Sequence, residues 1–270
     1  MSPRAPTDAI SKGDPTRQPW PVEAIREAVA PLLPGFTVEI LPEIDSTNSE
    51  LMRRARVGRM EPVLVAAEAQ TAGRGRMGRG WRSAPGDTLT FSLGLPLSPA
   101  AWSGLSLAVG VALAEALHSR VQLKWPNDLW VADRKLAGIL IETASLAAAP
   151  EVRRYAVIGV GINIQAPQAS GLSTAPASLA ELLPDAQCGT ALLRIVRGLV
   201  EAVQAFEALG FGPFQARFDA RDALRDRAVV LSDGREGTAH GTTEQGALLV
   251  HTAGGMNTVT SSEVSVRPAA

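Results

Sequence analysis

The first half of the chain contains apolar segments with the pattern of buried strands. Val63 to Ala69 is a mostly apolar run, and its end would bring Glu68 and Gln70 to the loop that follows. Thr88 to Leu95 alternates large apolar side chains with small polar ones. Side chains alternate between the two faces of a strand, so both segments, and likewise Arg154 to Ile164, are expected in one sheet. Helices are predicted for Val22 to Leu33, Pro99 to Ser119, Ala191 to Leu209 and Phe211 to Leu224.

The end of the chain has a different pattern, in which short apolar segments are separated by glycines. Strands are predicted for Ala228 to Ser232, Gly237 to Thr243, Ala247 to His251 and Thr258 to Val266, with a turn at Asp233-Gly234. Short strands separated by turn residues are typical of a small β-barrel. We therefore expect a larger domain at residues 22–224 and a β domain at residues 225–270.

The segment Met1 to Pro21 contains five prolines and few residues that could form a core. We expect it to be disordered. It lacks the apolar stretch of a signal peptide, and no segment elsewhere has the length and apolarity of a membrane span. The sequence therefore predicts no interaction with a membrane.

Composition narrows the functional classes. The chain has 270 residues, 46% of them hydrophobic, a net charge of −1 and a pI near 6.3. A dedicated nucleic-acid binder needs a basic face, which this balance does not favour. The single cysteine, Cys188, excludes an intramolecular disulfide and suits the cytoplasm. The histidines at positions 118, 240 and 251 lack zinc spacing, and no metal-binding residues are predicted.

The segment Gly73 to Trp81 reads G-R-G-R-M-G-R-G-W. Glycines allow backbone amides to approach a ligand, and Arg74, Arg76 and Arg79 supply forked donors for carboxylate or phosphate. Because glycine and arginine lose much conformational freedom on ordering, we expect this segment, Gly73 to Trp81, here called the arginine loop, to be mobile until an anion binds. Its composition alone equally suits a basic linker or an RGG-like nucleic-acid segment.

A second cluster begins at Lys124-Trp125-Pro126-Asn127-Asp128. Val121 to Lys124 is predicted to be a short strand that ends at Pro126, which places Asn127 and Asp128 at a strand end. Apolar runs on both sides of Asp133-Arg134 predict a hairpin. Lys135 then begins the return strand, close to Asp128. Ordinary turn residues and an edge-strand lysine would explain the same pattern.

Taken together, these motifs resemble the catalytic domain of biotin protein ligases. They occur in family order between about residues 36 and 265, and Met77 and Gly80 depart from residues that some relatives carry. The resemblance implies an α+β fold of the class II synthetase-like kind, with a mixed β-sheet packed with helices, and a C-terminal SH3-like β-barrel. The matching segments are Asp45 to Asn48, Gln70 to Trp81, Lys124 to Asp128, Lys135 to Glu142 and Gly159 to Asn163.

The resemblance also implies roles for individual residues. Lys135, Arg76 and Asp128 are the expected catalytic residues, with Asp128 as the candidate base. The residues expected around biotin are Ser46, Thr47, Asn48, Gln70, Arg74, Gly75, Arg76 and Lys135. Those expected on the ATP side are Arg79, Trp81, Asn127, Asp128 and Asn163, with Mg²⁺ held by the phosphates and one or two oxygen ligands.

The implied reaction joins biotin to ATP as biotinyl-5′-AMP and then transfers biotin to a lysine of a biotin carboxyl carrier domain of acetyl-CoA carboxylase or a related carboxylase. Only about 35 residues precede the motifs, too few for the DNA-binding winged helix of some relatives, so we expect a ligase that binds no DNA. We expect a monomer or weak homodimer. A lipoate ligase shares the adenylate chemistry, and a non-enzymatic nucleic-acid module would explain only the arginine loop.

Overall fold

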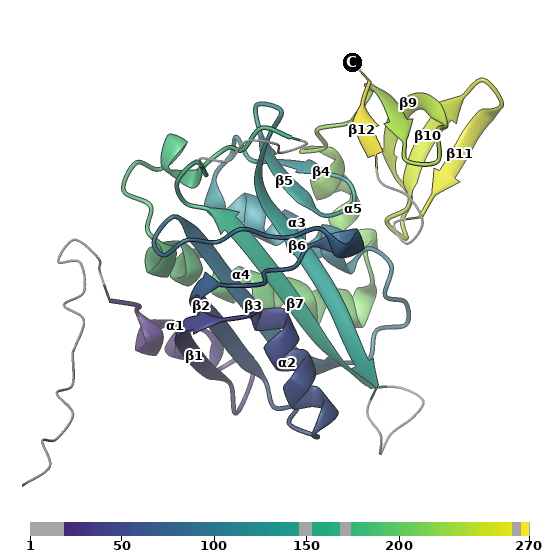
Figure 1. Cartoon of the computed structure of the whole chain (residues 1–270). Helices are drawn as coiled ribbons and strands as arrows, with labels where there is room; N and C mark the ends of the chain where they lie inside the picture. Colours follow the sequence, from purple (N-terminus) through teal and green to yellow (C-terminus); the bar gives the residue numbers. More distant parts are fainter. Residues whose placement is uncertain (1–18, 146–152, 168–173, 261–265, 270) are drawn as a thin grey trace, which may run out of the picture.

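The computed structural model describes residues 19–145, 153–167, 174–260 and 266–269. They form a seven-stranded sheet covered by helices and a smaller five-stranded sheet near the C-terminus (Figure 1). None of the helices in these ranges has the length and apolarity needed to cross a bilayer. The same ranges contain no group of three or more histidine, cysteine or acidic side chains arranged to hold a metal ion.

The large sheet is mixed, as expected. Its first two strands run parallel to each other, and every other neighbouring pair is antiparallel. The three strands predicted from apolar patterning lie in or next to its centre and are buried along most of their length. In spatial order the strands are β1 (Thr37–Ile44), β2 (Val63–Gln70), β3 (Thr88–Leu97), β7 (Arg154–Asn163), β6 (Arg134–Ser145), β5 (Asp128–Val131) and β4 (Gln122–Lys124).

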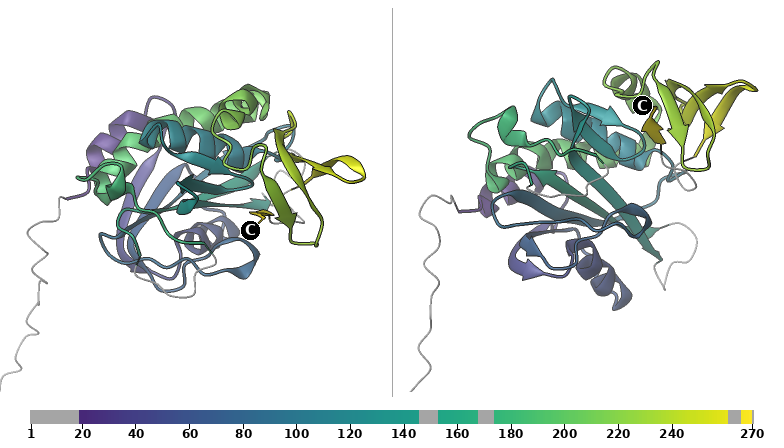
Figure 2. Two further views of the ribbon diagram at one scale, coloured as in Figure 1. Left: turned by 90° about the horizontal axis from the view of Figure 1, so that it is seen from above. Right: turned by 45° about the horizontal axis from the view of Figure 1, so that its top comes forward.

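Helices cover both faces of this sheet unequally (Figures 1 and 2). The main core lies between the sheet and α1 (Val22–Val29), α3 (Leu105–Leu117) and α4 (Cys188–Leu209), with α5 (Gly212–Asp219) beside α3. Ten of the 13 residues of α3 are buried, because the helix is enclosed between the sheet and α4. The other face carries α2 (Thr47–Arg56), which packs on a smaller apolar cluster.

The C-terminal β domain was expected and is confirmed as a five-stranded antiparallel sheet. Its spatial order is β11 (Gly255–Val259), β10 (Leu248–Thr252), β9 (Glu236–Thr242), β8 (Ala228–Leu231) and β12 (Val266–Pro268). The single strand predicted from Thr258 to Val266 is wrong. Val259 ends β11 opposite Leu248, whereas Val266 begins β12 opposite Leu231, so the two residues belong to opposite edges of the sheet.

Three predicted helices are shorter than expected. The segment 99–104 is not helical, because Gly104 adopts φ +88, and a Cβ there would approach Phe211 Cβ to 2.6 Å. The helix predicted to reach Leu224 ends at Asp219, because the following residues pair with Leu123 at the sheet edge. The first helix ends at Val29 and gives way to turns. The helix α2 and the strand β1 were not predicted.

The folded part of the chain begins earlier than the expected boundary at residue 22. Trp20 packs against the main core, and its indole N–H donates a hydrogen bond to Glu68 Oε1 at 3.3 Å. A Cβ on Gly189 would meet Pro21 Cδ at 2.7 Å, so Pro21 is also in close contact with α4. The expectation of disorder is therefore wrong for residues 19–21, and residues 1–18 lie outside the described part.

Candidate active site

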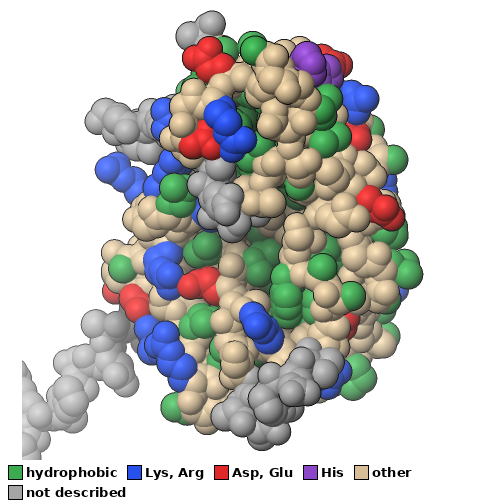
Figure 3. Space-filling view, turned by 90° about the vertical axis from the view of Figure 1, so that its right-hand side faces the viewer, with side chains coloured by type: hydrophobic (Ala, Val, Ile, Leu, Met, Phe, Trp, Pro, Cys, Tyr) green, Lys and Arg blue, Asp and Glu red, His purple; other side chains and the backbone are tan. Residues whose placement is uncertain are grey.

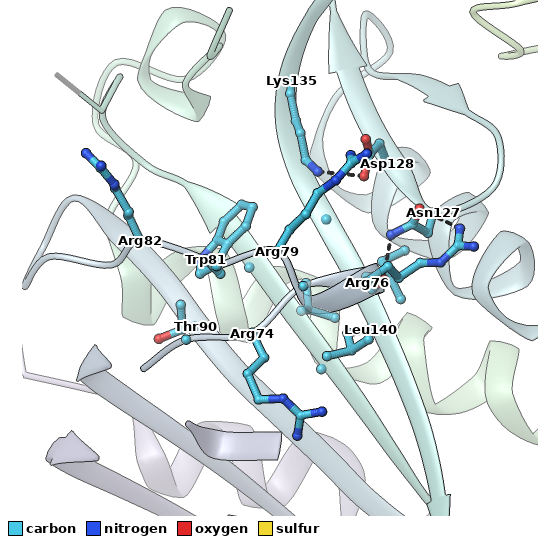
Figure 4. A pocket seen from close by; sticks show the side chains of 18 of the residues that line it. Arg74, Arg76, Arg79, Trp81, Arg82, Thr90, Asn127, Asp128, Lys135 and Leu140 are labelled. Atoms are coloured by element: carbon cyan, nitrogen blue, oxygen red, sulfur yellow. Dashed lines mark hydrogen bonds and ion pairs between the residues drawn. The ribbon is translucent and has the colours of Figure 1, made fainter. Parts of the chain in front are cut away.

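One cavity of about 740 Å³ brings the sequence motifs together above the large sheet (Figure 4). Its walls come from the start of α2, the end of β2, the arginine loop, the β4–β5 turn, and strands β6 and β7. All the residues predicted for the site lie in its lining: Ser46, Thr47, Asn48, Gln70, Arg74, Gly75, Arg76, Arg79, Trp81, Asn127, Asp128, Lys135 and Asn163.

The end of the cavity nearest α2 is lined mainly by uncharged polar side chains, and Arg74 lies at its edge in an ion pair with Glu142. Ser46 caps α2 by accepting a hydrogen bond from the backbone N–H of Ser49, which places Thr47 and Asn48 in the first helical turn. The backbone N–H of Thr47 donates to Gln70 Oε1 at 2.8 Å. This contact joins the start of α2 to the end of β2, so two segments far apart in the sequence form one wall.

The arginine loop folds back on itself as a narrow hairpin. Gly75 N–H donates to Arg79 O at 2.7 Å, and Trp81 N–H donates to Gly73 O at 2.8 Å. A Cβ on Gly73 would lie 2.3 Å from Trp81 O, so this position requires glycine. Met77, at the tip, has φ 54 and is exposed. The predicted mobility of the free loop stays a prediction.

The arginines of the loop point in different directions (Figure 4). Arg76 is partly buried and donates to Asn127 Oδ1 at 3.2 Å, and burial lowers the pKa of its guanidinium. Arg79 extends toward Asp128 and Lys135. Arg74 points away from them and forms an ion pair with Glu142 at 2.9 Å. The loop therefore joins both ends of the cavity.

The opposite end of the cavity carries positive charge. The hairpin formed by β5 and β6 places Lys135 Nζ 2.7 Å from Asp128 Oδ1, as the sequence predicted. Lys124 ends β4 opposite Asp128 in the strand register, and its Nζ lies 5.6 Å from the centre of the Trp130 ring.

Burial, together with repulsion from Lys135, Arg79 and Arg76, lowers the pKa of Lys124 to about 8, although Asp128 acts in the opposite direction. Four cationic side chains thus share one nearby carboxylate. Such an arrangement suits an anionic ligand, because a bound anion relieves the repulsion between the cations.

The indole of Trp81 covers the middle of the cavity floor. A Cβ on Gly161 would lie 2.3 Å from Trp81 Cε2, so the indole rests directly on the backbone of β7. Lys135 Nζ lies 5.8 Å from the ring centre. Trp81 Nε1 is buried against β7 and has no hydrogen-bond partner among the described residues.

The C-terminal domain also contributes to the site. Val266 and Arg267, in β12, lie in the cavity lining. Trp125, fully buried beside Lys124, donates its indole N–H to Gly246 O in the β9–β10 turn at 3.1 Å. A Cβ on Gly246 would lie 2.8 Å from Gly104 Cα, so this turn packs closely against the larger domain.

Sequence reasoning missed several residues that complete the site. Lys124 and Glu142 lie inside the motifs that the sequence showed, but neither was predicted to be a site residue. Nothing in the sequence around Arg267 indicated that it would line the cavity. Ser92 was read only as a small polar residue in an alternating strand. Its hydroxyl is fully buried and lies 2.7 Å from Thr47 Oγ1 and 2.6 Å from Asn48 Oδ1.

The sequence was compared with known proteins and protein families. Residues 41–163 match the biotin/lipoate A/B protein ligase family, and residues 230–267 match the biotin protein ligase C terminal domain. The chain is 36% identical to the bifunctional ligase/repressor BirA of Escherichia coli, over 93% of this chain and 81% of that protein. It is 31% identical to the biotin–[acetyl-CoA-carboxylase] ligase of Paracoccus denitrificans, over 83% of this chain and 98% of that protein.

Solved structures agree with these matches. The biotin protein ligase from Aquifex aeolicus in complex with biotin and ATP superimposes with a TM-score of 0.73 at 27% identity, covering 86% of this chain and 99% of that one. The enzyme from Leishmania major in complex with biotinyl-5-AMP gives a TM-score of 0.52 at 26% identity, covering 83% of this chain and 98% of that one. With both domains matched along most of their length, this chain belongs to the biotin protein ligase family.

Proposed function

We propose that this protein is a biotin protein ligase that activates biotin with ATP and transfers it to a lysine of a biotin carboxyl carrier domain. The observation that carries the proposal is the division of one cavity into a mainly uncharged polar end at α2, where Arg74 is paired with Glu142, and a cationic end at Lys124 and Lys135. A urea ring and a triphosphate need these two environments side by side. Relatives named as biotin–[acetyl-CoA-carboxylase] ligases support the carboxylase carrier as the partner.

In this proposal biotin enters with its ring at the α2 end. Ser46, Thr47, Asn48 and Gln70 supply hydrogen-bonding groups for the ureido ring, and Gly75 lets the loop backbone approach. Arg74 lines the cavity beside this ring, where its ion pair with Glu142 holds its guanidinium in place. The carboxylate of biotin then reaches toward Arg76 and Lys135.

ATP occupies the cationic end, where Arg79, Asn127 and Asn163 join Trp81 around the nucleotide. The biotin carboxylate attacks the α-phosphorus, the new bond to oxygen forms, and the bond to the pyrophosphate oxygen breaks. Lys135 and Arg76 stabilise the charge that develops during this step, since fixed donors in a dry site need no reorganisation. The products are biotinyl-5′-AMP and pyrophosphate.

Mg²⁺ fits this arrangement as a partner of the phosphates. Asp128 and Asn127 supply oxygen atoms at the cationic end, and no larger acidic cluster lies within the described residues. A hard cation that keeps most of its ligands from phosphates and water needs only one or two protein oxygens. When bound, it would neutralise charge on the phosphates.

The second step is attack of the carrier lysine on the acyl carbon of the adenylate, with AMP as the leaving group. The attacking amine must lose a proton, and an ordinary lysine is mostly protonated at neutral pH. Asp128 is our candidate base. Its carboxylate is paired with Lys135 Nζ at 2.7 Å, so we propose that Lys135 moves to the adenylate and frees the carboxylate.

The two alternative functions find less support. Lipoate ligases belong to the same matched family. However, the relatives matched over most of this chain are named bifunctional ligase/repressor BirA or biotin–[acetyl-CoA-carboxylase] ligase, and neither name refers to lipoate. A nucleic-acid module does not explain the cavity behind the arginine loop. On the face shown in Figure 3, basic and acidic side chains are interspersed, and no broad basic surface appears there.

We further propose that the enzyme acts in the cytoplasm, binds no DNA, and is a monomer or weak homodimer. The catalytic domain would extend to about residue 224 and the β domain from about 225 onward, in keeping with the pairing of residues 221–223 with Leu123. The near-neutral net charge supports the absence of a nucleic-acid partner.

Biotin-dependent exchange of labelled pyrophosphate into ATP tests the first step. We expect exchange with biotin and Mg²⁺, and little with lipoate at the same concentration. Asp233→Asn is a suitable control, because Asp233 lies outside the cavity lining and pairs with Arg235 at the surface of the C-terminal domain. Exchange that responds equally to both acids, or to neither, would contradict the assignment.

A further inference from the structure

Behind the α2 end of the cavity, a chain of polar side chains runs from the protein surface to Thr47. Arg74 pairs with Glu142 at 2.9 Å, and Glu142 accepts a hydrogen bond from Asn48 Nδ2 at 3.0 Å. Asn48 Oδ1 then lies 2.6 Å from Ser92 Oγ, which lies 2.7 Å from Thr47 Oγ1. Thr47 lines the cavity, whereas Ser92 is fully buried and does not.

The orientation of the Asn48 amide is fixed by its neighbours. Its Nδ2 faces two acceptors, Glu142 Oε2 at 3.0 Å and Leu140 O at 3.3 Å, so the amide oxygen must face Ser92. The amide also lies flat on β7, where a Cβ on Gly159 would come within 2.1 Å of Asn48 Oδ1. Rotation of this side chain is therefore blocked by packing as well as by hydrogen bonds.

This orientation determines where the hydroxyl protons point. An amide oxygen only accepts, so Ser92 must donate its one proton to Asn48. The oxygen of Ser92 is then an acceptor for the hydroxyl of Thr47. The other acceptor near Thr47 Oγ1 is Gln70 Oε1, which is farther away at 3.2 Å and already accepts the backbone N–H of Thr47.

We propose that Ser92 is a positioning residue that determines ligand specificity, because it draws the Thr47 hydroxyl proton inward and presents the Thr47 oxygen to the cavity as an acceptor. An acceptor at this place selects a ring that carries an N–H donor. The cyclic urea of biotin has such a group, and a dithiolane ring has none. The inference rests on the proposed function, since it names how that site distinguishes its acid substrate.

The direction of the hydrogen bonds from Thr47 to Glu142 matters for this selection. A threonine hydroxyl without the buried serine could donate or accept, because its proton would rotate freely. Because the hydroxyls of Thr47 and Ser92 and the amide of Asn48 all donate away from the cavity, the ligand meets a fixed hydrogen-bond acceptor at Thr47 Oγ1. A ring without a donor would leave this oxygen buried and unpaired. Leaving a buried polar group unpaired is the main source of discrimination at such sites.

The test is biotin binding by Ser92→Ala, measured by titration calorimetry alongside binding of a non-hydrolysable ATP analogue. We expect biotin affinity to fall about tenfold, in the range for loss of one buried hydrogen bond, and nucleotide affinity to stay within about twofold of wild type. If Ser92→Ala does not fold, Ser92→Cys keeps the volume similar with a weaker donor, and a smaller loss is expected. Unchanged biotin affinity in a folded variant would overturn the proposal.

A double-mutant cycle separates positioning from general stability. In a Thr47→Val background, Ser92→Ala should change biotin affinity by less than about twofold, because the group through which it acts is gone. Equal effects in the two backgrounds would show that Ser92 acts in another way. Thr242→Val is the matched control, since it removes a buried hydroxyl of the C-terminal domain that contacts Asp219, and biotin affinity should be unchanged.

The same experiment distinguishes the two proposals. Wild-type protein that binds no biotin would overturn the proposed function and this inference with it. Wild-type protein that binds biotin, with variants that show no coupling between Ser92 and Thr47, would overturn only the inference.

Discussion

Raising the pH above 8 should weaken nucleotide binding through one side chain, Lys124. Burial and three neighbouring cations lower the pKa of this lysine to about 8 in the unliganded protein. A triphosphate placed beside it favours the ammonium form and raises its pKa again. Because the protonated form binds the anion better, nucleotide affinity is highest below the free-enzyme pKa and falls as the pH rises through it.

The magnitude follows from the fraction of protein that carries the charged lysine. With a pKa of about 8, that fraction is roughly 0.9 at pH 7 and roughly 0.1 at pH 9. If only the charged form binds tightly, the apparent Kd scales as one plus ten to the power of pH minus pKa. Between about pH 7.5 and 9.5 the Kd should therefore rise about 25-fold. The terminal phosphate, with its last pKa near 6, is ionised throughout this range.

The assay is equilibrium titration with a non-hydrolysable ATP analogue at constant ionic strength. Lys124→Arg is the matched control, because an arginine side chain keeps its charge over the whole pH range. Any change of the Kd with pH that remains in this variant comes from other titrating groups. We expect the difference between wild type and Lys124→Arg to begin near pH 8. Parallel pH profiles for the two proteins would show that the charge of Lys124 does not contribute to nucleotide binding.

The remaining predictions concern single contacts in the site. Lys135→Ala should lower biotin-dependent pyrophosphate exchange about a hundredfold to a thousandfold while the circular dichroism spectrum stays native, and a wild-type rate would refute its role. Arg76→Gly should release biotinyl-5′-AMP before transfer, so that streptavidin blots of a mixed lysate show labelled bystander proteins; labelling of the carrier alone would contradict this. Trypsin should cleave the free protein within Gly73 to Trp81 and spare it when biotin and ATP are bound, whereas equal cleavage would mean a preformed loop. Trp125→Phe removes the hydrogen bond to Gly246 O and should raise the KM for ATP several-fold with the KM for biotin unchanged, and equal changes in both would argue for a general loss of structure.

The parts of the fold that the sequence predicted are those determined by local pattern. The apolar run from Val63 and the alternation from Thr88 identified two strands, and the turn near Asp133 correctly placed Lys135 beside Asp128. These features depend on neighbouring residues or on a hairpin whose strands follow each other closely. The helix α2 was missed, because its polar residues outnumber the few, among them Leu51 and Ala55, that pack inward.

The parts that could not be predicted depend on contacts between distant segments. Ser92 meets Thr47 and Asn48 across 44 or 45 positions of the chain, and nothing in the local sequence distinguishes it from a small residue in a core strand. The hydrogen bond from Trp125 to Gly246 joins residues 121 positions apart in different domains. The resemblance implied Arg74 beside biotin, and the ion pair that Arg74 forms with Glu142, 68 positions away, gave no local signal in the sequence.

The central claim is tested most directly by weighing a purified biotin carboxyl carrier domain after incubation with this protein, biotin, ATP and Mg²⁺. The account predicts a mass increase of one biotinyl group, lost when the acceptor lysine of the carrier is replaced by arginine and absent when lipoate replaces biotin. A carrier domain whose mass does not change, although the protein binds both biotin and ATP, would contradict the claim that this cavity is the active site of a biotin protein ligase.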